Sequence, residues 1–139
     1  MNQITKQPVE ITQELIALYT TRKEVCAKLL TTRNNKELSE KIPGIISQSD
    51  LGIKELMNEL SNYGDAVKSE VNRDSEYYVI WQNAQNGIDS LAPEEASHIF
   101  QKLEKHFQDY YENILQLSLK LPVSLNDILK RQLNRLAQT

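Results

Sequence analysis

An apolar stripe in the last third of the chain constrains the fold more than any other feature. Its members are separated by steps of three and four residues, the spacing that places side chains on one face of an α-helix. Pro93 is a favoured first helical residue, and Glu94 and Glu95 follow it at the positive end of the helix dipole. The sequence therefore predicts an amphipathic helix from Pro93 to about Lys120, with a stripe made of Ala96, Ile99, Leu103, Phe107, Tyr110, Ile114, Leu117 and Leu121.

The same spacing recurs elsewhere and predicts four more helices. The first runs from after Pro8 to about Thr31, and the second lies between the polar turns at 32–35 and 62–65. A third covers about 66–86, and a short one follows the break at Leu121-Pro122. Their apolar residues include Ile11, Leu15, Leu18, Val25 and Leu29, then Leu38, Ile42, Ile45 or Ile46, Ile53, Leu56 and Leu60, then Val67, Val71, Tyr78 and Trp81, and finally Ile128, Leu129, Leu133 and Leu136.

Two helix boundaries carry specific expectations. Pro43 lacks an N–H and clashes with the preceding turn, so either the second helix is split near Lys41 or it is kinked at Pro43. Ser124-Leu125-Asn126-Asp127 reads as an acidic variant of the capping box, which predicts that Ser124 caps the last helix.

These elements predict an all-α fold, namely an antiparallel up-down-up-down four-helix bundle with a short C-terminal fifth helix packed on or past its end. Only four Gly and four Pro punctuate 139 residues, which favours long elements and few loops. No period-two alternation of apolar residues is long enough to suggest a sheet. We expect residues 1–8 to form a flexible leader and residues 9–139 to form a single domain.

Composition excludes several classes of function. The net charge is −3, and basic and acidic residues are mixed along the chain, so no basic patch suggests a nucleic-acid partner. No segment is apolar enough to span a membrane, and the N-terminus lacks the apolar core of a signal peptide. The single cysteine, Cys26, cannot form an internal disulfide, and no cluster has zinc-site spacing. We therefore expect a cytoplasmic protein.

Three polar or small residues interrupt the stripes. Arg22 falls on the apolar face of the first helix, and we expect its long side chain to extend to the edge of the bundle and reach water. Ser49 and Gly52 occupy core-facing positions of the second helix. Their small size predicts either a close approach of another helix or a small internal cavity at that level.

Several short segments together resemble a bacterial family of ferritin-like four-helix-bundle proteins of unknown function. The similarity covers most of the chain, and its motifs are mostly structural. The residues that carry it are Tyr77-Tyr78-Val79-Ile80-Trp81, Glu104 seven residues before Tyr111, Leu121-Pro122, Gln132, and Glu55-Leu56 with Tyr63-Gly64.

The resemblance implies a bundle whose inner face can hold two metal ions through carboxylates and Glu-x-x-His pairs. This chain departs from that pattern, because Gln48 stands at the family's acidic position on the second helix and Tyr78-Val79 replaces its polar signature before Trp81. The only Glu-x-x-His match, Glu95 with His98, lies in the first turns of a helix, where the helix dipole explains it. With two histidines in the chain, a two-metal centre of the usual composition cannot be completed.

No other arrangement suggests catalysis. Cys26 lies beside an apolar face and is expected to be a buried, inert thiol, and no glycine-rich phosphate loop is present. We therefore expect a non-catalytic bundle without a cofactor, acting as an interaction or assembly module. Apolar residues outside the main stripes favour a homo-oligomer, such as a dimer, formed through the hairpin of the third and fourth helices or through the last helix; these residues are Ile16, Tyr19, Leu30, Val79, Phe100 and Leu119.

Two alternatives remain. One is a degenerate ferritin-like protein for metal binding or oxidative stress, which holds iron or another divalent ion through a remnant site of Glu24, Asp74 and Glu104, with Glu70 as the alternative to Asp74 and Gln48 as a further ligand. The other is a small apolar ligand bound in a pocket of Gln48, Gly52, Tyr78 and Trp81, beside the space left by Ser49.

Overall fold

The computed structural model describes residues 8–32, 36–63, 79, 82–83, 93–117 and 121–138. It contains helices α1 (Pro8–Thr32), α2 (Lys36–Ser61), α4 (Pro93–Leu117) and α5 (Val123–Ala137), and the described residues include no strand. The predicted all-α class is therefore confirmed for this part of the chain. Of the expected third helix only Val79, Gln82 and Asn83 are described, and all three are helical.

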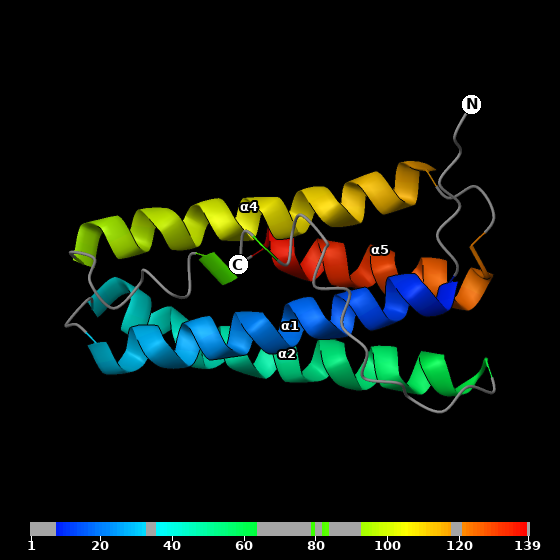
Figure 1. Ribbon diagram of the computed structural model, residues 1–139, viewed down its shortest axis with the longest axis horizontal. Coiled ribbons are helices and arrows are strands. Elements are labelled where there is room, and N and C mark those ends of the chain that lie inside the picture. The colour runs from blue at the N-terminus through cyan, green and yellow to red at the C-terminus, as the bar shows by residue number, and fades with distance from the viewer. Residues whose placement is uncertain are drawn as a thin grey trace.

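The four helices pack side by side as two antiparallel pairs (Figure 1). Helix α1 packs along α2, α4 packs along α5, and α5 also contacts α2. The pairs are joined across the interior by α1 and α4, where the rings of Tyr19 and Phe107 meet with their centroids 4.8 Å apart. Helix α5 thus packs along α4 and against α2, and it buries Leu125, Leu129 and Leu136.

The apolar core follows the predicted stripes. Each described helix contributes residues that are almost fully buried, because helical spacing turns one face of every helix inward. Among the residues outside the stripes, Tyr19 and Phe100 also belong to this core, whereas Val79 is 42% exposed. The buried set includes Ile11, Leu15 and Leu18 from α1, Ile42, Ile45 and Leu56 from α2, Leu103, Phe107 and Ile114 from α4, and Leu125, Leu129 and Leu136 from α5.

Helix α2 continues through Pro43, so of the two predicted alternatives the split near Lys41 is wrong, and the kink at Pro43 stays a prediction. Proline deprives the carbonyl of Ser39 of its helical N–H donor. Pro43 is exposed, so this turn lies at the surface, where water can solvate the carbonyl. The helix ends at Ser61, after which the N–H groups of Asn62 and Tyr63 donate to the carbonyls of Glu59 and Leu60 at 3.0 and 3.1 Å.

The predicted cap of α5 is also wrong. The helix begins at Val123, so Ser124 lies within its first turn, and no side chain caps it. The hydroxyl of Ser124 instead donates to Oε2 of Glu59 on α2 at 2.8 Å. The same carboxylate oxygen accepts a 2.6 Å hydrogen bond from Tyr63. A tertiary contact to a carboxylate that is only 3% exposed has replaced the local capping bond.

Candidate functional site

Polar side chains from all four described helices meet inside the bundle and form one hydrogen-bonded network. We call this network the polar seam. Because burying a polar group costs free energy unless the group is hydrogen-bonded, the partners of each group in the seam explain why it can be buried. Its members are Tyr19 and Arg22 of α1, Gln48, Ser49 and Glu55 of α2, Glu104 and Tyr111 of α4, and Gln132 and Arg135 of α5.

Arg22 and Glu104 form the ion pair at one end of the seam. Arg22 Nε donates to Glu104 Oε2 at 2.8 Å, and Nη2 forms a second, shorter contact with Oε1. The third guanidinium nitrogen, Nη1, donates to Gln48 Oε1 at 2.8 Å and to Ser49 Oγ at 3.1 Å. The arginine side chain is fully buried and the Glu104 side chain is 14% exposed.

This arrangement contradicts the expectation that Arg22 reaches water. Burial alone would lower the pKa of Arg22, but the charge of Glu104 and its hydrogen bonds outweigh burial and raise this pKa. The guanidinium carbon also lies 5.6 Å from the centre of the Phe107 ring, within the range of a cation–π contact. Arg22 is therefore a permanent cation held between α1, α2 and α4.

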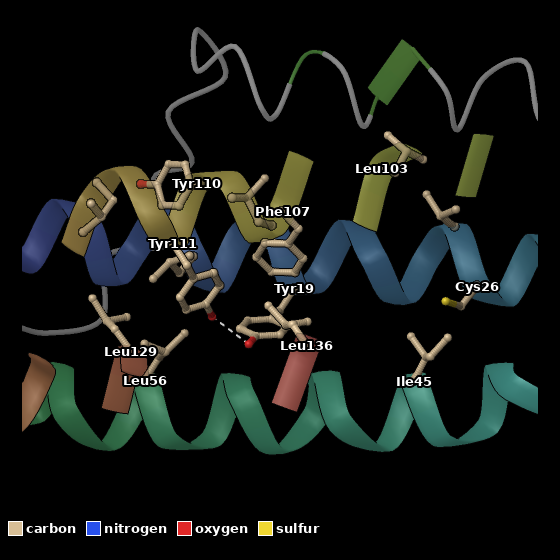
Figure 2. Packing of buried hydrophobic residues seen from close by; sticks show 14 of the residues in the cluster. Tyr19, Cys26, Ile45, Leu56, Leu103, Phe107, Tyr110, Tyr111, Leu129 and Leu136 are labelled. Atoms are coloured by element: carbon tan, nitrogen blue, oxygen red, sulfur yellow. Dashed lines mark hydrogen bonds between the residues drawn. The ribbon is translucent and has the colours of Figure 1, made fainter. Parts of the chain in front are cut away.

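Two buried tyrosines continue the seam. The hydroxyls of Tyr19 and Tyr111 are hydrogen-bonded at 2.6 Å, and Figure 2 shows the two rings pointing toward each other between the helices. Tyr111 also donates to Gln132 Oε1 at 2.7 Å. Burial raises the pKa of Tyr19 to about 12 and raises that of Tyr111 well above its ordinary value. Both phenols are therefore neutral at physiological pH.

A second ion pair closes the seam between α2 and α5. Arg135 contacts Glu55 with both terminal nitrogens, at 2.7 and 2.8 Å, in the bidentate geometry that gives strong arginine–carboxylate pairs. Gln132 Nε2 donates to Glu55 Oε1 at 3.1 Å and to the carbonyl of Gly52 at 3.3 Å. The hydrogen bonds from Arg135 are the main cause of the lowered pKa of Glu55. Gln48 Nε2 links the two ion pairs by donating to the carbonyl of Arg135 at 3.3 Å.

The small residues of α2 create a close approach, which was one of the two outcomes expected from Ser49 and Gly52. A Cβ atom built on Gly52 would lie 2.6 Å from Cζ of Tyr19, so the phenol ring occupies the place of a side chain. Ser49 is fully buried and donates to the carbonyl of Ile45 at 2.8 Å while it accepts from Arg22. Both residues serve to admit groups from α1.

The predicted site residues have different positions. Glu104, Gln48 and Gly52 lie in or against the polar seam, whereas Glu24 is exposed. Among the residues that the structure describes, no group of three or more His, Cys, Asp and Glu side chains is placed to hold a metal ion. The remnant metal site and the apolar pocket remain predictions, because the other residues assigned to them, Asp74, Glu70, Tyr78 and Trp81, lie outside the described residues.

Sequence reasoning missed most of the polar seam, although two of its members carried a signal. Arg22 and Gln132 occupy positions where helical spacing requires apolar residues, since Gln132 falls between Leu129 and Leu136 at steps of three and four. A polar residue inside such a stripe indicates a buried partner on another helix. The bond between Glu55 and Arg135 had no comparable signal, because both types are common on helix surfaces.

The ionised side chains of the polar seam are paired with one another. Each carboxylate of the seam is held by an arginine, and both tyrosines are neutral. Cys26 is fully buried, as predicted, and burial raises the pKa of its thiol to about 12, so the nucleophilic thiolate is disfavoured. The arrangement ties helices together without exposing an acid, a base or a nucleophile among these groups.

None of the described helices has the length and apolar character required to cross a membrane. Comparison of the chain with known protein families, with curated proteins and with solved structures finds no match.

Proposed function

We propose that this chain is a non-catalytic, ferritin-like helical bundle that acts as an interaction or assembly module and forms a homodimer. In this proposal the segment from 66 to 86 supplies a further helix, giving an up-down-up-down bundle with the last helix as a fifth element. The single reduced cysteine is the basis for placing the protein in the cytoplasm. The proposed role is to present helix faces to a partner while the interior stays fixed.

The observation that carries this proposal is the Arg22–Glu104 pair. In a ferritin-like metal centre, carboxylates inside the bundle neutralise the charge of bound cations. Here a guanidinium supplies the positive charge that such a carboxylate requires, and three of its nitrogens are already hydrogen-bonded. A cation brought to Glu104 would compete with this arginine, whose side chain is fully buried.

The assembly role is tested by measuring the molar mass of the full chain in solution. Multi-angle light scattering across a wide range of protein concentrations should show a mass that rises above that of one chain. A mass equal to one chain at the highest concentration would contradict homodimer formation. The measurement should be repeated at high salt, because screening distinguishes charge-driven from apolar association.

The alternative of a degenerate metal-binding or oxidative-stress protein retains one favourable observation. Glu104 does lie between helices, with a side chain that is 14% exposed. Metal analysis of protein purified without chelators provides the test, with Glu104→Gln as the variant and Glu112→Gln, an exposed acid on the same helix, as its control. Bound metal that is lost only in Glu104→Gln would support this alternative; no metal in the wild-type protein would reject it.

A further inference from the structure

Helix α2 carries a second stripe on the face that points away from the bundle. Six exposed residues follow one another at steps of four, three, four, three and four, the spacing of the contact positions in a coiled coil. We call this set the outer stripe of α2. It consists of Glu40, Gly44, Ser47, Leu51, Lys54 and Asn58. The inner face of the same helix has the corresponding spacing, so α2 has one seam inside the bundle and a second that is exposed among the residues that the structure describes.

Size and charge change in order along the outer stripe. Its first half combines an acid, Glu40, with two small residues, Gly44 and Ser47, and a Cβ atom built on Gly44 would meet no atom within 4 Å. Its second half carries the longer side chains of Leu51, which is 45% exposed, and Lys54. Within the six residues of the stripe, one end is therefore open and acidic and the other is bulky and basic, while the exposed Lys41 lies next to Glu40 outside the stripe.

A second copy of α2 in antiparallel orientation places large side chains opposite small ones, and basic side chains near acidic ones, along the outer stripe. When the two helices cross at position 49, Leu51 faces Ser47 of the second copy and Lys54 lies over Gly44 of the second copy. The ammonium group of Lys54 then comes within reach of Glu40, one turn further along the second copy. Two-fold symmetry repeats each contact, so the stripe is complementary to itself.

A parallel pair of the same helices lacks this match. It would place Glu40 beside Glu40 and Lys54 beside Lys54, which is repulsive, and it would set the small residues against each other. A lone exposed Leu51 would need no partner, so its exposure is not the basis of the inference. The order of charge and size along the stripe is the basis, and it favours the antiparallel orientation.

Two further exposed charges of α2, Lys41 and Asp50, lie outside the outer stripe. Asp50 is exposed and would approach its equivalent near the two-fold axis of the antiparallel pair. This carboxylate already forms an ion pair with Lys23 of α1 in the same protomer. Its charge is thus balanced before association, and the pair of Asp50 residues does not oppose dimer formation strongly.

We propose that two copies of this chain associate through the outer stripe of α2, packed antiparallel around a two-fold axis. This inference rests on the assembly function proposed above and names its surface, which differs from the third, fourth and last helices expected from the sequence. A single pair of helices with one large apolar residue each buries less surface than a standard stable interface. The dimer is therefore weak, forms at high protein concentration and weakens as salt is added.

The first test is a charge exchange between Glu40 and Lys54, measured by sedimentation equilibrium of the full chain. Both side chains are exposed, and their positions on one helix are 14 residues or about 21 Å apart, so they do not contact each other within a protomer. Glu40→Lys and Lys54→Glu should each weaken association about tenfold, because each creates two like-charge contacts in the dimer. The double variant should restore it.

Net charge provides an internal control, because the two single variants change it in opposite directions while both should weaken the dimer.

A second test places a larger side chain at Gly44, the open position of the outer stripe. A Cβ atom at position 44 meets no atom within 4 Å in the monomer, whereas the side chain of Gly44→Gln would collide with Lys54 of the second copy, so this variant should also weaken association about tenfold. Val123→Gln, at a residue of α5 that is 77% exposed, should leave association unchanged.

The outcomes separate this inference from the function on which it rests. A wild-type dimer that is insensitive to the charge exchange and to Gly44→Gln would overturn the assignment to the outer stripe alone. Light scattering or sedimentation that shows a monomer at every concentration would overturn both this assignment and the homodimer proposed above.

Discussion

The ion pair between Arg22 and Glu104 predicts an asymmetry between its two single substitutions. Breaking a buried ion pair by removing one partner costs about 3–5 kcal/mol, because the other charge is left uncompensated. Arg22 is fully buried and cannot lose its proton at any accessible pH. Glu104 is 14% exposed, so its carboxylate can reach water when the arginine is removed. Glu104→Leu should therefore lower the free energy of unfolding more than Arg22→Met does.

The magnitudes follow from the groups that remain. In Glu104→Leu the guanidinium keeps hydrogen bonds only to the neutral side chains of Gln48 and Ser49. We therefore expect the free energy of unfolding to fall by about 5 kcal/mol, the upper end of the range for a broken buried ion pair. In Arg22→Met we expect about 3 kcal/mol, since Ser49 retains its bond to the carbonyl of Ile45. The double variant removes both charges and substitutes apolar groups of similar length. It should be more stable than Glu104→Leu alone.

Urea unfolding followed by circular dichroism measures all four proteins, and the free energies form a double-mutant cycle. The slope of each transition must stay constant for the comparison to hold. If the two single losses were equal and simply added in the double variant, the pair would contribute no coupling. The account of Arg22 as a charge confined by Glu104 would then be refuted.

Three further predictions concern other parts of the bundle. Gly52→Ala should lower the melting temperature at a cost of about 1–3 kcal/mol, because its Cβ would collide with Tyr19, whereas Gly44→Ala, in open space on the same helix, should raise stability by about 1 kcal/mol. The pKa of Glu55 is lowered on folding, so the stability that its carboxylate contributes is present above about pH 4.5 and is lost as the pH falls through the folded pKa. The urea midpoint of Glu55→Gln should therefore fall less on acidification than that of the wild type. Finally, Cys26 should react with a thiol reagent at the rate of unfolding, and fast labelling under native conditions would contradict its burial.

Local signals were enough to predict the described helices. Pro93 marks the start of α4, and the steps of three and four after it identify the buried face. Periodicity reports which side of a helix is inside, so the core residues of α1, α2 and α4 followed directly. The helix from 66 to 86 and the ferritin-like topology stay predictions.

The candidate site was harder to predict, because its contacts join residues that are distant in sequence. Arg22 and Glu104 are 82 residues apart, and nothing in the local sequence of either indicates the other. The same reason explains the wrong cap at Ser124, since its hydroxyl bonds to Glu59, which lies 65 residues earlier. A propensity rule describes neighbours along the chain, and a tertiary acceptor overrides it.

The buried arginine also limits how the helices can slide past one another. An apolar stripe is nearly periodic, so shifting α1 along α4 by one turn, about 5.4 Å, would still bring aliphatic groups into contact. The same shift would carry the guanidinium away from its carboxylate and leave the fully buried charge of Arg22 without an anionic partner. Shifted alignments of the helices are therefore less stable even where their apolar contacts are equally good. Arg22 in this way fixes the axial position of α1 relative to α2 and α4.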